Sequence, residues 1–119
     1  MIFERPTSKE DAEHILNACL FDPQSKDKPI DQLNVVKWYK NFLNDENRTF
    51  VNQVLKEWLL SNDYNYVMEA SALIHLCNIV SLLDPLKLCL KNCKKQTTKL
   101  HKMYCKMIEK AIQDLSSEQ

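Results

Sequence analysis

The sequence predicts an all-α fold, a single-domain bundle of about five helices over residues 1–119. Three observations support it: apolar residues recur at helical spacing, glycine is absent, and the segment of residues 63–83 is apolar on nearly every side. Hairpin turns with positive φ favour glycine, so a β-rich fold is not expected. A helix that is apolar all round belongs in a bundle or a membrane. Because its apolar run begins only at Met68, it is shorter than the roughly 20 apolar residues of a membrane span. The run also contains Glu69, His75 and Asn78, so we favour the bundle.

The first helix is predicted over residues 8–20. Thr7 as N-cap and Glu10 three residues later match a capping box. The segment of residues 22–30 holds two prolines and mixed charges, and is predicted to be a flexible surface loop. The apolar stripe of the helix is formed by Ala12, Ile15, Leu16, Cys19 and Leu20.

Two further helices are predicted over residues 31–43 and 47–60. Asp31 is the expected N-cap of the second helix, and the run from Asn44 to Asn47 is the expected turn before the third. In the third helix apolar residues recur in pairs every four positions, which is the spacing of one buried helix face. These pairs are formed by Phe50, Val51, Val54, Leu55, Trp58 and Leu59.

The fourth helix, predicted over residues 63–83, is expected to be the centre of the core. Its residues Leu73, Ile74, Leu76 and Cys77 should then all be buried, and Leu76→Ala should cost about 2–5 kcal/mol. His75 is the one ionisable residue whose burial this placement almost forces. A lone histidine there is expected to be a neutral core residue rather than a base.

The last helix is predicted over residues 85–115, with Asp84 as N-cap and Pro85 at the first helical position. One helical period places its apolar residues on one side and all eight lysines on the other. A continuous C-terminal amphipathic helix, about 45 Å long at 1.5 Å per residue, is therefore favoured over a hairpin broken at the segment KKQTT. The 18- and 21-residue spacing of the turns also fits HEAT- or armadillo-like stacked hairpins, as an alternative to an ordinary bundle.

The absence of glycine also restricts the chemistry. Phosphate-cradling loops, dinucleotide fingerprints and nucleophile elbows all need glycine where the backbone turns tightly or approaches a ligand. None of the three histidines is paired with a plausible nucleophile. We therefore expect neither catalysis nor a bound cofactor, and interpret the chain as a non-catalytic protein–protein interaction module, an adaptor or subunit of a larger complex.

The cysteines are odd in number, five, and most of them fall on predicted apolar faces. The N-terminal residues contain no apolar signal core. Both features favour a reducing compartment, either cytoplasmic or nuclear, in which cysteines act as small buried hydrophobes.

A zinc site is the alternative for the C-terminal cysteines. Cys89, Cys93, His101 and Cys105 form two i, i+4 pairs and would make a Cys3His set if the pairs converged. In a continuous helix, however, Cys89 and Cys105 would lie about 24 Å apart. We therefore expect no metal.

Charge is distributed unevenly although the net charge is zero. Residues 1–84 hold 8 Lys+Arg against 13 Asp+Glu, whereas residues 85–119 hold 8 lysines against 3 acids. A solvated outer face is the simplest interpretation of the lysines. As a binding surface, they are expected to contact a protein partner or residues 1–84 of a second copy; nucleic acid is the alternative, and a membrane is not expected. Trp38 and Tyr39 are adjacent, so at least one is expected at the domain margin as an aromatic anchor. The predicted partner-binding residues are Trp38, Tyr39, Lys94, Lys95, Lys99 and Lys102.

Overall fold

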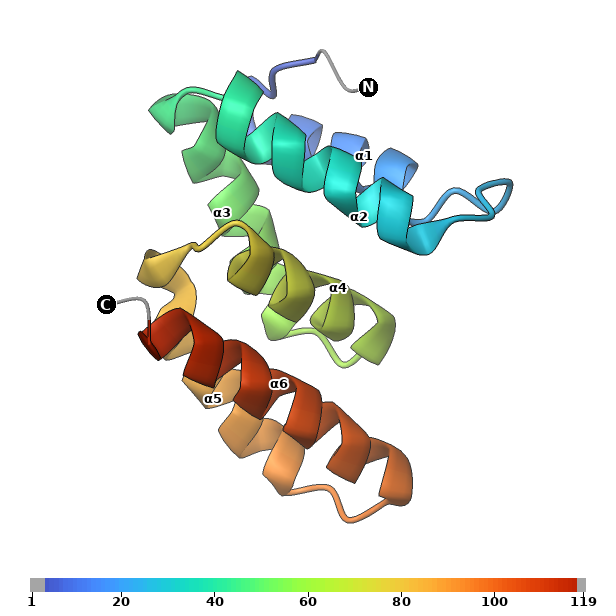
Figure 1. Ribbon diagram of the computed structural model, residues 1–119, viewed down its shortest axis with the longest axis vertical. Helices are drawn as coiled ribbons and strands as arrows, with labels where there is room; N and C mark the ends of the chain where they lie inside the picture. The colour runs from blue at the N-terminus through green and yellow to red at the C-terminus, as the bar shows by residue number, and fades with distance from the viewer. Residues whose placement is uncertain (1–3, 118–119) are drawn as a thin grey trace. The chain divides into compact units, whose positions relative to one another are not determined.

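The computed structural model describes residues 4–117, and in this range the chain is all-helical with no strand (Figure 1). The all-α prediction is confirmed, whereas the count of about five is wrong, because residues 4–117 contain six α-helices. They are α1 (Lys9–Leu20), α2 (Lys28–Lys37), α3 (Asp45–Leu59), α4 (Tyr64–Leu76), α5 (Leu83–Lys94) and α6 (Lys99–Ser117). A π-helical segment, η1 (Trp38–Phe42), follows α2, and a 3-10 turn, η2 (Val80–Leu82), precedes α5.

The chain comprises two compact units, residues 1–54 (the N-terminal unit) and 55–119 (the C-terminal unit), with the boundary inside α3. The single-domain organisation stays a prediction. None of the helices within residues 4–117 has the length and apolar character needed to cross a membrane.

In the N-terminal unit, the first two helices begin at caps other than those predicted. Ser8, not Thr7, is the N-cap of α1: its hydroxyl accepts from the Asp11 backbone N–H, while the Asp11 carboxylate accepts from the Thr7 N–H at 3.0 Å. Asp27, not Asp31, caps α2, and Pro29 lies in its first turn. The predicted loop over residues 22–30 therefore ends early, because a proline inside the first turn is compatible with a helix.

The π-helical segment η1 explains why two adjacent aromatic residues are both buried. Trp38 and Tyr39 are only 2% and 8% exposed. Trp38 Nε1 donates to Glu4 O at 2.7 Å, and Tyr39 OH donates to Asn52 Oδ1 at 2.8 Å. The guanidinium of Arg48 completes the segment by donating to the carbonyls of Tyr39 and Lys40 at 2.9 and 2.8 Å. The two rings are thus buried and hydrogen-bonded to distant residues of the N-terminal unit, and the margin position expected for one of them is wrong.

In the C-terminal unit, α4 ends seven residues earlier than predicted. Asn78 adopts a left-handed backbone, with φ of 54°. Its N–H donates to His75 O at 3.1 Å and that of Ile79 to Ile74 O at 3.0 Å, the two bonds of a Schellman motif. The central apolar run is therefore divided among α4, η2 and the start of α5.

The predicted continuous helix over residues 85–115 is wrong. α5 begins at Leu83, so Asp84 lies in the first turn rather than at the cap, and it ends at Lys94. Thr98 then starts a new helix. Its Oγ1 accepts from the His101 N–H at 3.1 Å, and its carbonyl accepts from the Lys102 N–H at 3.1 Å, as in a first helical turn. α6 folds back and packs against both α5 and α4.

The ending of α4 also changes which of its residues are buried. Leu73, Ile74 and Cys77 are buried as predicted, but Leu76 is 41% exposed. His75 is half-exposed rather than buried, and its Nε2 lies 3.5 Å from Asp114 Oδ2.

We expect Leu73→Ala to lower the free energy of unfolding by about 2–5 kcal/mol, since Leu73 is 1% exposed and its loss leaves a cavity. The matched variant Leu76→Ala should cost less than about 1 kcal/mol, because Leu76 is partly solvated. Urea unfolding of both proteins measures the difference, and equal losses would contradict this placement of the core.

Candidate functional site

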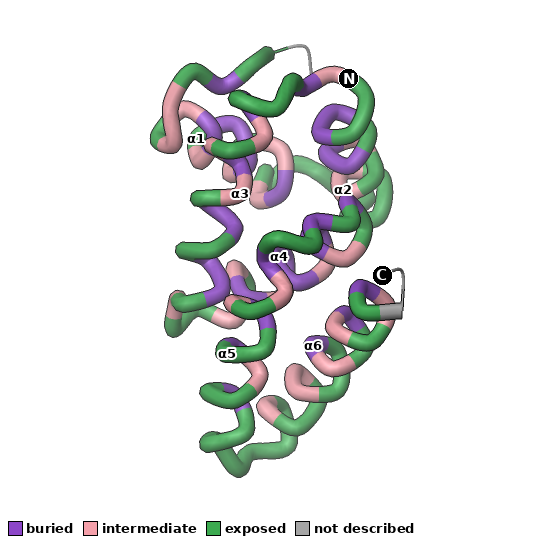
Figure 2. Tube along the Cα trace, turned by 90° about the vertical axis from the view of Figure 1, so that its left-hand side faces the viewer, coloured by how far each residue is buried: buried purple, intermediate pink, exposed green. Residues whose placement is uncertain are grey.

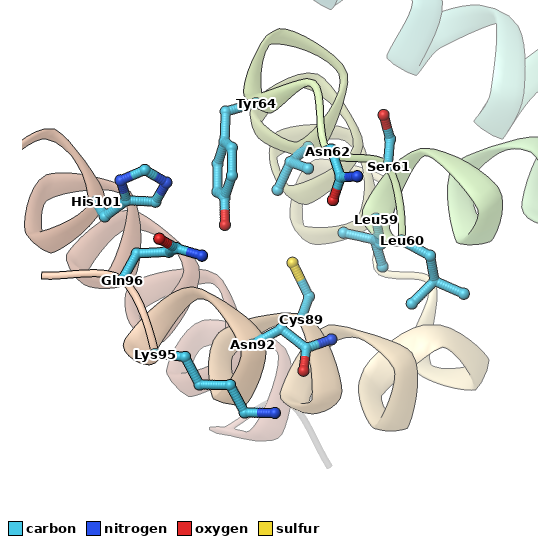
Figure 3. A pocket seen from close by; sticks show the side chains of 11 residues that line it. Leu59, Leu60, Ser61, Asn62, Tyr64, Cys89, Asn92, Lys95, Gln96 and His101 are labelled. Carbon is cyan, nitrogen blue, oxygen red and sulfur yellow. The ribbon is translucent and has the colours of Figure 1, made fainter. Parts of the chain in front are cut away.

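A pocket of about 550 Å³ opens in the C-terminal unit between the turn that precedes α4, the side of α5 and the turn that joins α5 to α6 (Figure 3). In Figure 3 the Cys89 Sγ points into the pocket from α5, and the Tyr64 ring extends into it from α4 beside His101. No carboxylate is among the residues that line it. These residues are Leu59, Leu60, Ser61, Asn62, Tyr64, Val67, Cys89, Asn92, Lys95, Gln96 and His101.

The aromatic wall of the pocket is rigidly supported. The rings of Tyr64 and Tyr104 stack with centroids 4.7 Å apart and an interplanar angle of 10°. His101 meets the Tyr64 ring edge-on at 4.8 Å, and its Nδ1 lies 2.6 Å from Thr98 Oγ1. The cap of α6 therefore also orients the imidazole in the pocket wall.

The α5–α6 hairpin brings three thiols together beneath this wall. Burial, followed by a hydrogen bond with the Cys93 side chain, raises the pKa of Tyr64 to about 12 and the pKa of Cys105 to about 11. Burial also raises the pKa of Cys89 to about 11, with the neighbouring thiols Cys93 and Cys105 contributing. The Cys93 thiol itself donates to His101 O at 3.4 Å. At neutral pH the Cys89 and Cys105 thiols are therefore protonated, and a protonated thiol is a poor nucleophile.

The hairpin removes the distance argument against the zinc alternative, because Cys89, Cys93, His101 and Cys105 all belong to one hairpin instead of a straight helix. The His101 imidazole nevertheless faces Thr98 and the tyrosines. Among residues 4–117 no group of three or more His, Cys, Asp or Glu is arranged to hold a metal ion. The absence of zinc stays a prediction.

The four lysines of the predicted partner surface gather around the α5–α6 turn. Lys94 is the last residue of α5 and Lys95 is its C-cap, whereas Lys99 and Lys102 lie in the first turn of α6. All four are exposed, in agreement with the green α5–α6 turn in Figure 2. Lys94 Nζ lies 3.2 Å from Glu109 Oε1. The lysines therefore lie on two helices rather than along one face of a single helix. Trp38 and Tyr39, whose rings are buried in the N-terminal unit, do not provide the exposed anchors that were expected.

A second surface feature was not predicted: an exposed apolar stripe on α6, formed by Leu100, Met103 and Met107. Each of these side chains is 49–52% exposed. At about 100° per residue, the three lie within about 60° of one another on the helix. The single apolar side predicted for residues 85–115 is therefore not buried as a whole: Leu100 and Met107 are exposed, and the buried face of α6 is formed by Ile108, Ala111 and Leu115. The spacing i, i+3, i+7 was present in the sequence, but it does not distinguish a buried stripe from an exposed one.

Beside this stripe lies an apolar groove of about 360 Å³ between α4 and α6. It is lined by Met68, Ser71, Ala72, His75, Met107, Lys110, Ala111 and Asp114.

Compared with known proteins, the sequence matches no family description, no curated protein and no solved structure.

We expect Cys105 to react slowly with iodoacetamide in the folded protein. Raising its pKa from 9.0 to about 11 lowers the thiolate fraction at pH 8 by about 100-fold, and the rate should keep rising until the pH approaches 11. Mass spectrometry of the modified peptide measures the rate, and the urea-unfolded chain is the control. Equal rates in the two states at pH 8 would contradict the thiol cluster.

Proposed function

We propose that this chain is a non-catalytic protein–protein interaction module, an adaptor or subunit of a larger intracellular complex. The observation that carries the proposal is the Leu/Met stripe of α6, in which three long apolar side chains remain about half exposed in a row. Contiguous exposed apolar surface of this kind marks contact sites in soluble proteins. Methionine suits such surfaces because its flexible thioether adapts to the partner.

The charges around the stripe support the same proposal. Lys99, Lys106 and Lys110 follow its edge on α6 and are exposed. The two acids of this helix within the described residues are engaged elsewhere, Glu109 with Lys94 and Asp114 with His75. An apolar centre with a charged rim is the usual composition of a protein interface.

The chemistry of the pocket in Figure 3 supports a non-catalytic role. A nucleophilic cysteine or a general base needs a pKa near the working pH. In the pocket, burial raises the pKa of Cys89 to about 11 and that of Tyr64 to about 12. Burial likewise raises the pKa of Cys105, which does not line the pocket, to about 11. The five cysteines are free thiols, which supports a reducing location, in the cytoplasm or nucleus. The α1–α2 and α5–α6 hairpins are elements from which a HEAT- or armadillo-like stack is built, and such stacking stays part of the proposal.

Nucleic-acid binding by the α5–α6 turn is the second candidate. The observation that favours it is the cluster of exposed lysines Lys95, Lys99 and Lys102. Because α5 and α6 form a hairpin, these lysines span a shorter distance than they would on one continuous helix, and they would contact fewer consecutive phosphates. Neither α5 nor α6 contains arginine, the side chain most often used to read bases.

We expect the full chain, used as bait in a nuclease-treated lysate, to retain protein partners that Met103→Glu no longer retains, because a carboxylate in the stripe opposes its desolvation. The matched control is Leu33→Glu, which places the same charge at an equally exposed leucine (50%) on α2. Quantitative mass spectrometry of the retained proteins compares the three baits. Identical partner sets for Met103→Glu and the unchanged chain would contradict the proposal.

We expect no binding of DNA or RNA oligonucleotides tighter than the non-specific range of about 10⁻⁴–10⁻⁶ M at physiological salt. Fluorescence anisotropy at two salt concentrations measures this, with Lys94, Lys95, Lys99 and Lys102 changed together to glutamate as the comparison. Sub-micromolar binding that the four changes abolish would establish the second candidate instead.

A further inference from the structure

We infer that the groove between α4 and α6 docks the apolar face of an amphipathic helix whose flanks are acidic, supplied by a protein partner. This inference rests on the proposed function and names the chemistry of the partner. It depends on the shape of the groove, its length and the charges along its rim.

The shape of the groove follows from the parallel packing of α4 and α6. Tyr64 stacks on Tyr104 near the start of both helices, and His75 contacts Asp114 near their ends. Between these two contacts the facing residues are small: Ser71 and Ala111 are buried, and Ala72 is half-buried. Small residues therefore form the floor of the groove, and the long side chains of Met68 and Met107 line it beside them.

The length of the groove suits two turns of a helix. Met68 and His75 are seven residues apart on α4, which corresponds to about 10 Å at 1.5 Å per residue. An amphipathic helix that lies in a groove of this length contributes side chains at i, i+3 or i+4, and i+7. Small residues in the floor let such side chains approach closely, and the methionines adjust to their shape.

The charge of the rim selects an acidic partner. Lys110 lines the groove, and Lys106 lies one turn before it on α6. Asp114, the one carboxylate lining the groove, already contacts His75. Complementary charge speeds association and fixes the orientation of the partner. A basic helix would place like charges against these lysines and is disfavoured.

The test uses the full chain labelled with ¹³C at its methionine methyl groups, because three of the four methionines, Met68, Met103 and Met107, lie on or beside the groove. The probe is a synthetic peptide of about four helical turns, with leucine at i, i+3 and i+7 and glutamate and alanine elsewhere. We expect the acidic peptide to shift the Met68 and Met107 methyl signals saturably. A peptide with lysine in place of glutamate, and one with scrambled leucines, should not.

Two variants test the mode of binding. Ala72→Trp fills the groove and should abolish the peptide-induced shifts; a thermal melt checks that the variant is folded. The double variant Lys106→Glu/Lys110→Glu should weaken the acidic peptide by about tenfold. The matched control Lys87→Glu/Lys91→Glu changes the charge equally, at the same i, i+4 spacing on α5, and should leave binding unchanged.

The lysine peptide shifting these signals as strongly as the acidic one would overturn the inference, as would no saturable shift with the acidic peptide. Concentration-dependent self-association that Ala72→Trp abolishes would also overturn it, because the occupant would then be a second copy. If these results occur while Met103→Glu still loses its protein partners, the groove assignment fails and the proposed function stands.

Discussion

The C-terminal unit depends on the hydrogen bonds that Thr98 makes at the start of α6. Its side chain and carbonyl satisfy backbone N–H groups that would be unpaired at a new helix start. Without this cap, the segment that follows α5 has the periodicity of one uninterrupted helix. Because the chain turns here, α6 can lie against α4 as well as α5. The pocket beside Tyr64, the thiol cluster and the α4–α6 groove all exist only because of that turn.

Much of the secondary structure could be predicted from apolar periodicity, but helix ends could not. Helical spacing located the α1, α3 and α4 segments because their buried faces repeat regularly. The two major errors, at Asn78 and at Thr98, share a physical cause. Both residues end or begin a helix through backbone conformation and hydrogen bonding, without any break in the hydrophobic period. In a chain without glycine, the usual marker of a helix C-terminus is missing.

The candidate site was predictable only in part, for a related reason. The lysines around the α5–α6 turn could be identified because a charged side chain is expected at the surface wherever the helix places it. The stripe of Leu100, Met103 and Met107 could not, because the hydrophobic pattern of an exposed apolar face resembles that of a core face. For Trp38 and Tyr39 the error is the reverse: at least one was expected at the domain margin, and both are buried. A regular α-helix separates adjacent side chains by about 100°, but in η1 both rings find partners and are buried.

Asn78, with its φ of 54°, has a consequence for the unfolded chain. Most proteins place glycine at such positions, and glycine gives the unfolded state more backbone freedom than any other residue. A glycine-free chain has fewer unfolded conformations to lose on folding, which raises stability without adding a native contact. Within residues 4–117 the energetic cost falls on the left-handed conformation of one asparagine, a residue that tolerates it better than most. In compact units as small as these, whose cores are limited by size, a restricted unfolded state adds to the stability that the core provides.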